Sequence, residues 1–158
     1  MGEFVPFEEV DHTADYALVA RGRDLAELLR NASLGLCRLL ADVDSLPPPL
    51  ERRPLHATAP SRERLLVGWL RELLFLHETQ TVVFSGVGLD EVTDRPDGMP
   101  PELTREALPP LAASGWADVV PADAAPDAVR AELKAVTYHD LEIEERDGLL
   151  RVRITFDT

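Results

Sequence analysis

The sequence predicts a single α+β domain over residues 1–158, in which two helices pack on one face of a mixed, mostly antiparallel sheet. Two segments carry an apolar residue at every third or fourth position, which is the pattern of an amphipathic helix. Segments near both ends of the chain alternate or are continuously apolar, which is typical of strands. Asp147-Gly148, close to the C-terminus, is a strong signal for a two-residue β-hairpin turn.

Two helices are predicted. The first spans about 24–40, and its start, with Asp24 followed three residues later by Glu27, resembles a capping box. The second spans about 61–77 and opens on a serine, a residue type that favours the N-cap position. Gly68 lies inside the second helix and weakens it by roughly 1 kcal/mol relative to alanine, so packing has to stabilise this helix.

Strands are expected on either side of the helices. Residues 4–10 and 14–20 are read as extended, and the second segment is mostly apolar, as in a buried strand. Residues 51–60 alternate loosely, as in an outer strand, and residues 81–92 return to a β pattern. Residues 129–135 alternate strictly between apolar and charged side chains, so a further strand is expected there.

The hairpin signal also predicts a register. If Asp147 and Gly148 are the central turn residues, Glu144 lies opposite Arg151, and apolar residues further along face one another. A slip of one residue would destroy both sets of pairs. Extended along the strand, this register places Tyr138 opposite Asp157.

Two further residues are placed by the same register. His139 falls opposite Phe156 on the apolar face, where a core histidine is expected. Lys134 shares the polar face with Tyr138, about 13 Å away along the strand.

Residues 93–126 differ in composition from the rest of the chain. They hold more than half of the 13 prolines and many alanines. We expect an excursion from the domain that is a solvated surface loop, with a short helix near 101–108. The alternative is a lid that binds a partner.

Charge excludes one class of function. The chain has 16 Lys and Arg against 29 Asp and Glu, a net charge of −13. Binding of nucleic acid through a broad basic face is therefore excluded, because phosphate contact needs clustered basic residues.

A cytoplasmic location is the expectation for this chain. It has no 18-residue apolar run, no signal-peptide pattern, and one cysteine, which cannot form an internal disulfide. That cysteine, Cys37, lies among leucines and is read as a small core residue rather than a catalytic thiol.

Candidate site residues occur at both ends of the chain. Asp15 begins an apolar strand, and a carboxylate beside apolar residues needs partners. These partners are either backbone N–H groups in an Asx turn or a cation shared with the C-terminus. Asp157 and the α-carboxylate of Thr158 offer the oxygen ligands that Ca²⁺ and Mg²⁺ take.

Other chemistries find little support in the sequence. None of the four histidines has zinc-site spacing, and no phosphate-binding glycine motif occurs. A metal-dependent hydrolase built on Asp11, His12 and Asp15 is the weakest alternative, because no nucleophile or metal-bound water site can be assembled around them.

Several ordered motifs together resemble the archease family. They cover nearly the whole chain: Asp11-His12-Thr13-Ala14-Asp15, the helix segment 65–74, Lys134-Ala135-Val136-Thr137-Tyr138-His139, and Phe156-Asp157-Thr158. Two departures from the family pattern are the longer segment 93–126 and the terminal threonine, where an aliphatic residue is usual.

The resemblance implies a protein that is not itself an enzyme but activates an RtcB-type RNA ligase in tRNA splicing or RNA repair, promoting guanylylation and multiple turnover. It implies a divalent cation, usually Ca²⁺, held by Asp15, Asp157 and Thr158. RNA would be reached only through the ligase. The alternative is a general chaperone or modulator of RNA-modifying enzymes, such as a tRNA methyltransferase.

The motifs also imply residues that act on the partner. Lys134 corresponds to a functionally important lysine of the family, and the remaining motif residues expected to take part in activation are Asp11, His12, Tyr138 and His139.

Overall fold

The structure is a computed structural model that describes residues 3–10, 16–94, 110–138 and 141–158. The helices and strands of these residues are, in chain order, β1 (Phe7–Val10), β2 (Tyr16–Gly22), α1 (Leu25–Leu40), β3 (Glu51–Ala59), α2 (Arg62–Gln80), β4 (Val82–Thr93), β5 (Leu111–Pro121), β6 (Ala135–Thr137), β7 (Glu144–Arg146) and β8 (Leu149–Asp157).

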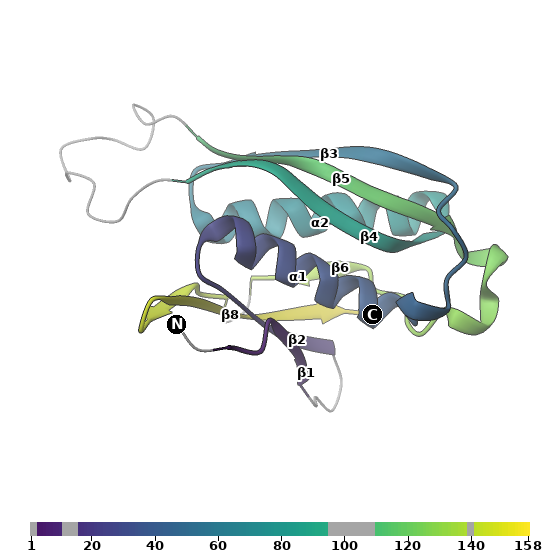
Figure 1. Ribbon diagram of the computed structural model, residues 1–158, viewed down its shortest axis with the longest axis horizontal. Coiled ribbons are helices and arrows are strands. Elements are labelled where there is room, and N and C mark those ends of the chain that lie inside the picture. Colours follow the sequence, from purple (N-terminus) through teal and green to yellow (C-terminus); the bar gives the residue numbers. More distant parts are fainter. Residues whose placement is uncertain (1–2, 11–15, 95–109, 139–140) are drawn as a thin grey trace.

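These elements form three layers, with the two helices between two sheets (Figure 1). One sheet has the order β1-β2-β8-β6, with β7 also paired to β8, and the other has the order β3-β5-β4. Every strand pairing among the described residues is antiparallel. The predicted α+β class is confirmed, and the finding that differs is the division of the strands into two sheets.

Both predicted helix starts are confirmed. Asp24 caps α1, since its Oδ1 accepts a hydrogen bond from the Glu27 N–H at 2.8 Å. The Glu27 carboxylate reaches back to the Arg23 N–H at 3.0 Å, one residue before the cap. Ser61 caps α2 by accepting a hydrogen bond from the Arg64 N–H at 3.3 Å. These bonds satisfy backbone N–H groups that a helix start leaves without partners.

The core lies between the layers, and a buried hydrogen bond joins the two helices. Trp69 on α2 donates its indole N–H to the Ser33 hydroxyl on α1 at 2.8 Å, and Ser33 donates to the Leu29 carbonyl at 2.6 Å. Gly35 lets α1 approach β2 closely, because a Cβ at this position would lie 2.7 Å from the Leu18 methyl carbons.

The excursion expected over residues 93–126 is wrong for residues 111–121. These form β5, the central strand of the three-stranded sheet, paired with both β3 and β4. Small residues concealed the strand pattern. One of them, Gly115, is needed there because a Cβ at this position would lie 2.0 Å from the Gly88 carbonyl oxygen of β4. The short helix expected near 101–108 lies outside the described residues.

The strand expected from residue 129 is shorter than its alternation predicts. Val129 forms a single bridge to Ala41, and the Arg130 N–H donates to the Leu40 carbonyl at 2.8 Å. This segment is therefore bonded to the end of α1 rather than to a neighbouring strand, and the ladder begins only at Ala135. Leu133 is buried, in agreement with the predicted face.

The Asp147-Gly148 hairpin is confirmed. Both residues have positive φ, 55° and 78°, as a two-residue hairpin turn of type I′ requires. Glu144 pairs with Arg151 in the predicted register, and their side chains form an ion pair at 3.9 Å.

No helix among the described residues has the length and apolar character that crossing a membrane requires.

Gly68→Ala is expected to raise the free energy of unfolding by up to about 1 kcal/mol. An added Cβ would meet only the Ala57 Cβ, at 4.0 Å, which is ordinary van der Waals contact. Gly35→Ala is the matched control with the opposite sign, because its Cβ would overlap Leu18; overpacking of this kind costs about 1–3 kcal/mol. Urea unfolding measures both variants. A loss of stability in Gly68→Ala would contradict the prediction.

The expectation that Cys37 is a core residue is confirmed, since it is buried and its burial raises the pKa of the thiol to about 12. The unfolded thiol ionises near its ordinary pKa of 9.0, while the folded thiol keeps its proton. The contribution of the protonated Cys37 thiol to the free energy of unfolding is therefore fully present below about pH 9. It is lost as the pH rises toward about 12. We expect the free energy of unfolding to fall more steeply in the wild type than in Cys37→Ala over this range, and equal slopes would contradict the prediction.

Candidate functional site

Strands β2 and β8 bring the two ends of the chain to one place. Tyr16, the first residue of β2, pairs with Phe156 of β8. The Phe156 side chain is buried beneath the sheet, whereas the next residue, Asp157, is exposed. Asp15 lies outside the described residues. Tyr16, which follows Asp15 in the chain, is thus paired with Phe156, which precedes Asp157.

The third strand at this place is β6, and its register corrects a prediction. Ala135, and not Tyr138, pairs with Asp157, and Val136 rather than His139 lies opposite Phe156. The predicted register was wrong here because the chain leaves the sheet between β6 and β7. Residues 138 and 141–143 lie outside the strands, and the Leu141 N–H donates to the Tyr138 carbonyl at 3.1 Å.

The shifted register moves Lys134 toward Asp157. The Lys134 N–H donates to the Asp157 carbonyl at 2.9 Å, so the two residues are direct backbone neighbours. Both side chains are exposed. The structure therefore brings Lys134, Asp157 and the adjoining Thr158 together, while Tyr138 lies three residues beyond the Asp157 partner, roughly 10 Å along the strand.

One buried oxygen at this place has no partner. The Thr137 hydroxyl is buried and makes no hydrogen bond in the part of the chain that the structure describes. Thr137 pairs with Thr155, two residues before Asp157 and therefore on the same face of β8. An unsatisfied buried polar group costs about 1–3 kcal/mol. A ligand that binds the Thr137 hydroxyl oxygen would therefore be favoured here. Sequence reasoning quoted Thr137 only as part of a motif.

The chemical type of the available donor atoms fits a hard cation. The described groups at this place are the Asp157 carboxylate, the Thr158 terminus and the Thr137 hydroxyl, all of which offer oxygen, the ligand that Ca²⁺ and Mg²⁺ prefer. Within the described residues no group of three or more His, Cys, Asp or Glu side chains could hold a metal ion. Further ligands would have to come from Asp15 and from water.

Four predicted site residues are not placed by the structure. Asp11, His12, Asp15 and His139 all lie outside the described residues.

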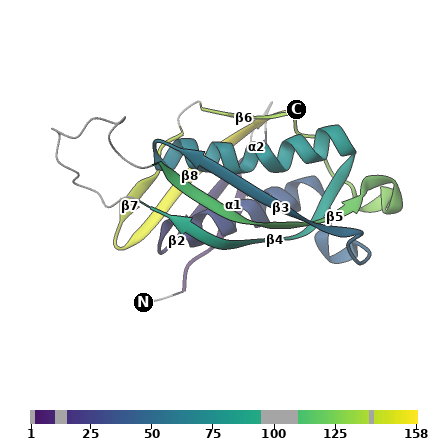
Figure 2. The same ribbon diagram turned by 90° about the horizontal axis from the view of Figure 1, so that it is seen from above.

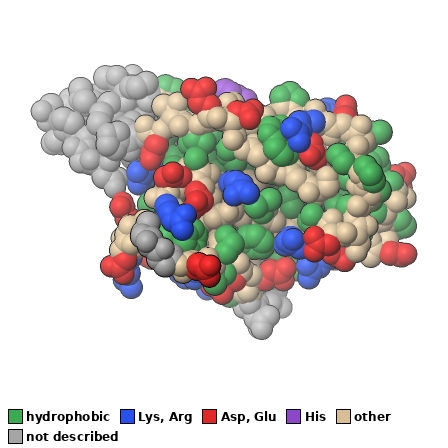
Figure 3. Space-filling model, in the orientation of Figure 1, with side chains coloured by type: hydrophobic (Ala, Val, Ile, Leu, Met, Phe, Trp, Pro, Cys, Tyr) green, Lys and Arg blue, Asp and Glu red, His purple; other side chains and the backbone are tan. Residues whose placement is uncertain are grey.

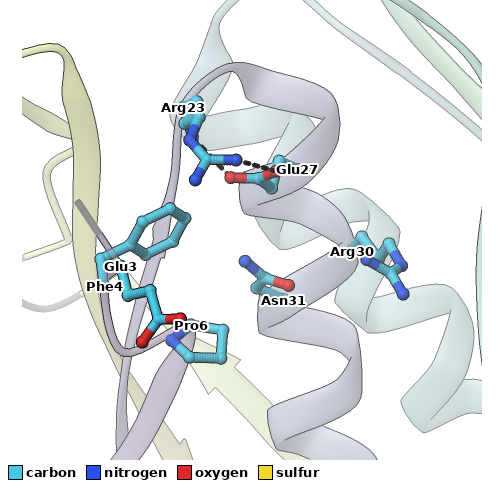
Figure 4. Close-up of a pocket in the computed structure, with 7 residues that line it drawn as sticks. All are labelled: Glu3, Phe4, Pro6, Arg23, Glu27, Arg30 and Asn31. Carbon is cyan, nitrogen blue, oxygen red and sulfur yellow. Dashed lines mark hydrogen bonds and ion pairs between the residues drawn. The ribbon is translucent and has the colours of Figure 1, made fainter. Parts of the chain in front are cut away.

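A separate pocket of about 290 Å³ lies between the N-terminal segment and the first turns of α1 (Figure 4). The Arg23 guanidinium lies 5.0 Å from the Phe4 ring centroid and 3.8 Å from a Glu27 carboxylate oxygen. Asn31 donates its side-chain N–H to the Arg21 carbonyl at 2.7 Å. Of these contacts, the one between Arg23 and Phe4 joins the N-terminal segment to the start of α1.

A stacked arginine covers the outer face of the three-stranded sheet. The Arg52 guanidinium lies 3.6 Å from the Trp116 ring centroid and makes two hydrogen bonds to the Asp118 carboxylate, at 2.8 and 3.2 Å. The hydrogen bonds to Asp118 raise the pKa of Arg52. Gly88 makes room for the ring, because a Cβ there would lie 2.4 Å from it. Arg52 therefore covers one face of the Trp116 ring, and its guanidinium is already hydrogen-bonded to Asp118.

The acidic excess is spread rather than concentrated on the face shown in Figure 3. Asp and Glu side chains alternate there with Lys and Arg, and hydrophobic side chains lie between them. Several charged side chains of the chain are paired, for example Arg38 with Asp44 at 3.5 Å. Such exposed pairs contribute little to stability.

Comparisons with known proteins agree with this architecture. The sequence model of the Archease protein family matches residues 7–158. Protein archease of Methanothermobacter thermautotrophicus is 35% identical over 151 residues, covering 96% of this chain and 97% of that protein. Protein archease of Methanosarcina mazei is 33% identical over 154 residues, covering 96% of this chain and 94% of that protein.

Two solved structures are similar as well. The solution structure of a Methanobacterium thermoautotrophicum protein has a TM-score of 0.73 and 30% identity, covering 97% of this chain and 99% of that chain. The crystal structure of an archease from Thermotoga maritima, described as a possible chaperone, has a TM-score of 0.57 and 18% identity, with 96% of each chain covered. The second likeness shows the fold alone.

Proposed function

Because this chain belongs to the archease family, we propose that it is a non-enzymatic protein cofactor that activates an RtcB-type RNA ligase in tRNA splicing or RNA repair. Activation would promote guanylylation of the ligase and its repeated turnover. The observation that carries the proposal is the hydrogen bond of 2.9 Å between the Lys134 N–H and the Asp157 carbonyl. It joins two motifs on which the family resemblance rests.

A divalent cation, Ca²⁺, is part of the proposal. Asp15, Asp157 and the Thr158 terminus would hold it, and the unpartnered Thr137 hydroxyl on the same face supports an oxygen-rich site. When bound, the cation would supply a positive charge to which anionic oxygens of the reacting groups on the ligase can bind. The role of the chain is then to fix the Asp157 carboxylate at the end of β8, beside Lys134.

The charge of the chain is consistent with this role. A protein with a net charge of −13 is a poor ligand for phosphates. In the proposal the ligase holds the RNA, and this chain contacts RNA only through the ligase. Asp11, His12, Tyr138 and His139 stay predicted contributors to activation.

Asp157→Ala is expected to lower the number of ligations per ligase by at least about tenfold, since loss of an outer metal-site group already costs 10- to 100-fold. Turnover is measured with a purified RtcB-type ligase and its RNA substrate, with and without the full chain. Calorimetric titration with Ca²⁺ is expected to show binding by the wild type and weaker binding by the variant.

Asp123→Ala is the matched control, because Asp123 is an exposed aspartate in a short 3₁₀ turn that follows β5. It should leave both turnover and Ca²⁺ binding unchanged. No effect of the wild-type chain on ligation, or full activity of Asp157→Ala, would overturn the proposal.

A second candidate is a general chaperone or a modulator of RNA-modifying enzymes such as a tRNA methyltransferase. The observation that favours it is that the similar Thermotoga maritima protein is described as a possible chaperone. Light scattering of a client protein during heating discriminates the two roles. A ligase activator is expected to leave client aggregation unchanged, whereas suppression of aggregation that is equal in the wild type and in Asp157→Ala would favour the chaperone.

A further inference from the structure

An exposed surface of α2 lies beside β6, and its α2 residues have no role in the function proposed above. In Figure 2, β6 lies alongside α2, with the C-terminus next to it. Two of the five large hydrophobic side chains exposed among the described residues lie here: Phe75 is 61% exposed and Tyr138 is 49% exposed. Together with Arg71 they form what we call the α2–β6 surface.

The three side chains form one patch. Arg71 and Phe75 are four residues apart on α2, so they are neighbours on one side of the helix. The Arg71 guanidinium lies 5.2 Å from the centroid of the Tyr138 ring. Arginine therefore neighbours two exposed aromatic side chains, and this combination is enriched where protein interfaces derive most of their binding energy.

The patch is held in place by the chain around it. After Tyr138, the Ile143 N–H donates to the Glu63 carboxylate on α2 at 3.3 Å, and Leu141 and Ile143 pack against the core. The opposite side of α2 is buried through residues such as Leu73 and Leu74. Exposure of Phe75 is thus not caused by a loose helix, and the surface is presented in a fixed shape.

The charges nearby indicate the kind of partner. Exposed charges of both signs lie on α2 and on the segment before β6, namely Glu72, Glu78 and Glu132 against Arg64 and Lys134, but the chain as a whole has a net charge of −13. An enzyme that holds RNA carries basic surface, so the electrostatic potentials of the two proteins would be complementary. A second copy of this chain would instead bring like charges together.

Position gives a further argument. Tyr138 follows Ala135, the Asp157 partner, by three residues, roughly 10 Å along the strand. A typical interface covers about 800 Å² on each protein. Strand alternation places Lys134 and Tyr138 on one face of β6, and Asp157, opposite Ala135, on the other. Because β6 is the edge strand of its sheet among the described residues, a partner that covers this edge to reach Lys134 and Asp157 would cover Tyr138 and the adjoining face of α2 as well.

We propose that the α2–β6 surface docks the RNA ligase, with Arg71, Phe75 and Tyr138 as anchors, so that Lys134 and Asp157 are presented to it. This inference rests on the proposed function, and it separates two tasks on one protein. The α2–β6 surface supplies affinity, while the end of β8 supplies activation.

The test measures binding and activation separately, with the full chain and a purified RtcB-type ligase. Phe75→Ser and Arg71→Glu are each expected to weaken binding by at least about tenfold, the effect of losing an interface anchor. Both should raise the concentration needed for half-maximal activation while maximal turnover is recovered at high concentration. Asp157→Ala should show the reverse, with binding retained and maximal turnover lost.

Leu50→Ser is the matched control, since Leu50 is 70% exposed and lies next to β3 of the other sheet. It should bind and activate like the wild type, and thermal unfolding verifies that all variants are folded.

Equal binding and activation by the wild type, Phe75→Ser and Arg71→Glu would overturn this inference and leave the proposed function standing. A wild type that binds the ligase without activating it would overturn the proposed function alone. Sedimentation showing a dimer that only Phe75→Ser and Arg71→Glu disrupt, with ligase binding unchanged, would assign the surface to a second copy and overturn the inference.

Discussion

The antiparallel pairing of β2 with β8 is the constraint on which the rest of the structure depends. It runs from Gly22 opposite Leu150 to Tyr16 opposite Phe156, and so joins the first and last parts of the chain. Ile154 and Phe156 are buried under the helices. A slip of one residue would turn these side chains to the outer face. The register that protects the core is therefore also the register that fixes where Asp157 emerges.

The two helices fix the position of the second sheet relative to the β2–β8 pair. Gly35 sets α1 directly on Leu18 of β2, and the hydrogen bond from Trp69 to Ser33 sets α2 against α1. Both groups of that bond are buried, and breaking it would leave a buried donor unsatisfied, which costs about 1–3 kcal/mol. The position of α2 relative to β8 is thus closely determined, and with it the position of the α2–β6 surface.

Function is proposed at the border of this framework rather than in its core. Lys134, Asp157 and Tyr138 are all exposed, and their backbones are held by β6, β8 and α2. An activator that works by contact needs such an arrangement, because its groups must reach into a partner while their own positions stay fixed. The net charge of −13 then has a place in the proposal, since it complements an enzyme that binds RNA.

The sequence by itself determined the elements whose signals are local. The caps at Asp24 and Ser61, the hairpin at Asp147-Gly148 and the core position of Cys37 depend on a few neighbouring residues, and all four predictions are confirmed. The motifs that carry the family resemblance are local in the same sense. For this reason the family could be identified before any contact between the chain ends was known.

Tertiary structure decided what local patterns do not encode. Strand β5 contains a run of small residues, of which Gly115 is required because β4 lies against it, so its pattern resembles a loop. The register of β6 against β8 differs from that of β7, and Ile143, just before β7, bonds to Glu63 on α2. That contact joins residues 80 positions apart. No periodicity near Tyr138 could reveal it, nor the register that sets Ala135, with Lys134 beside it, opposite Asp157.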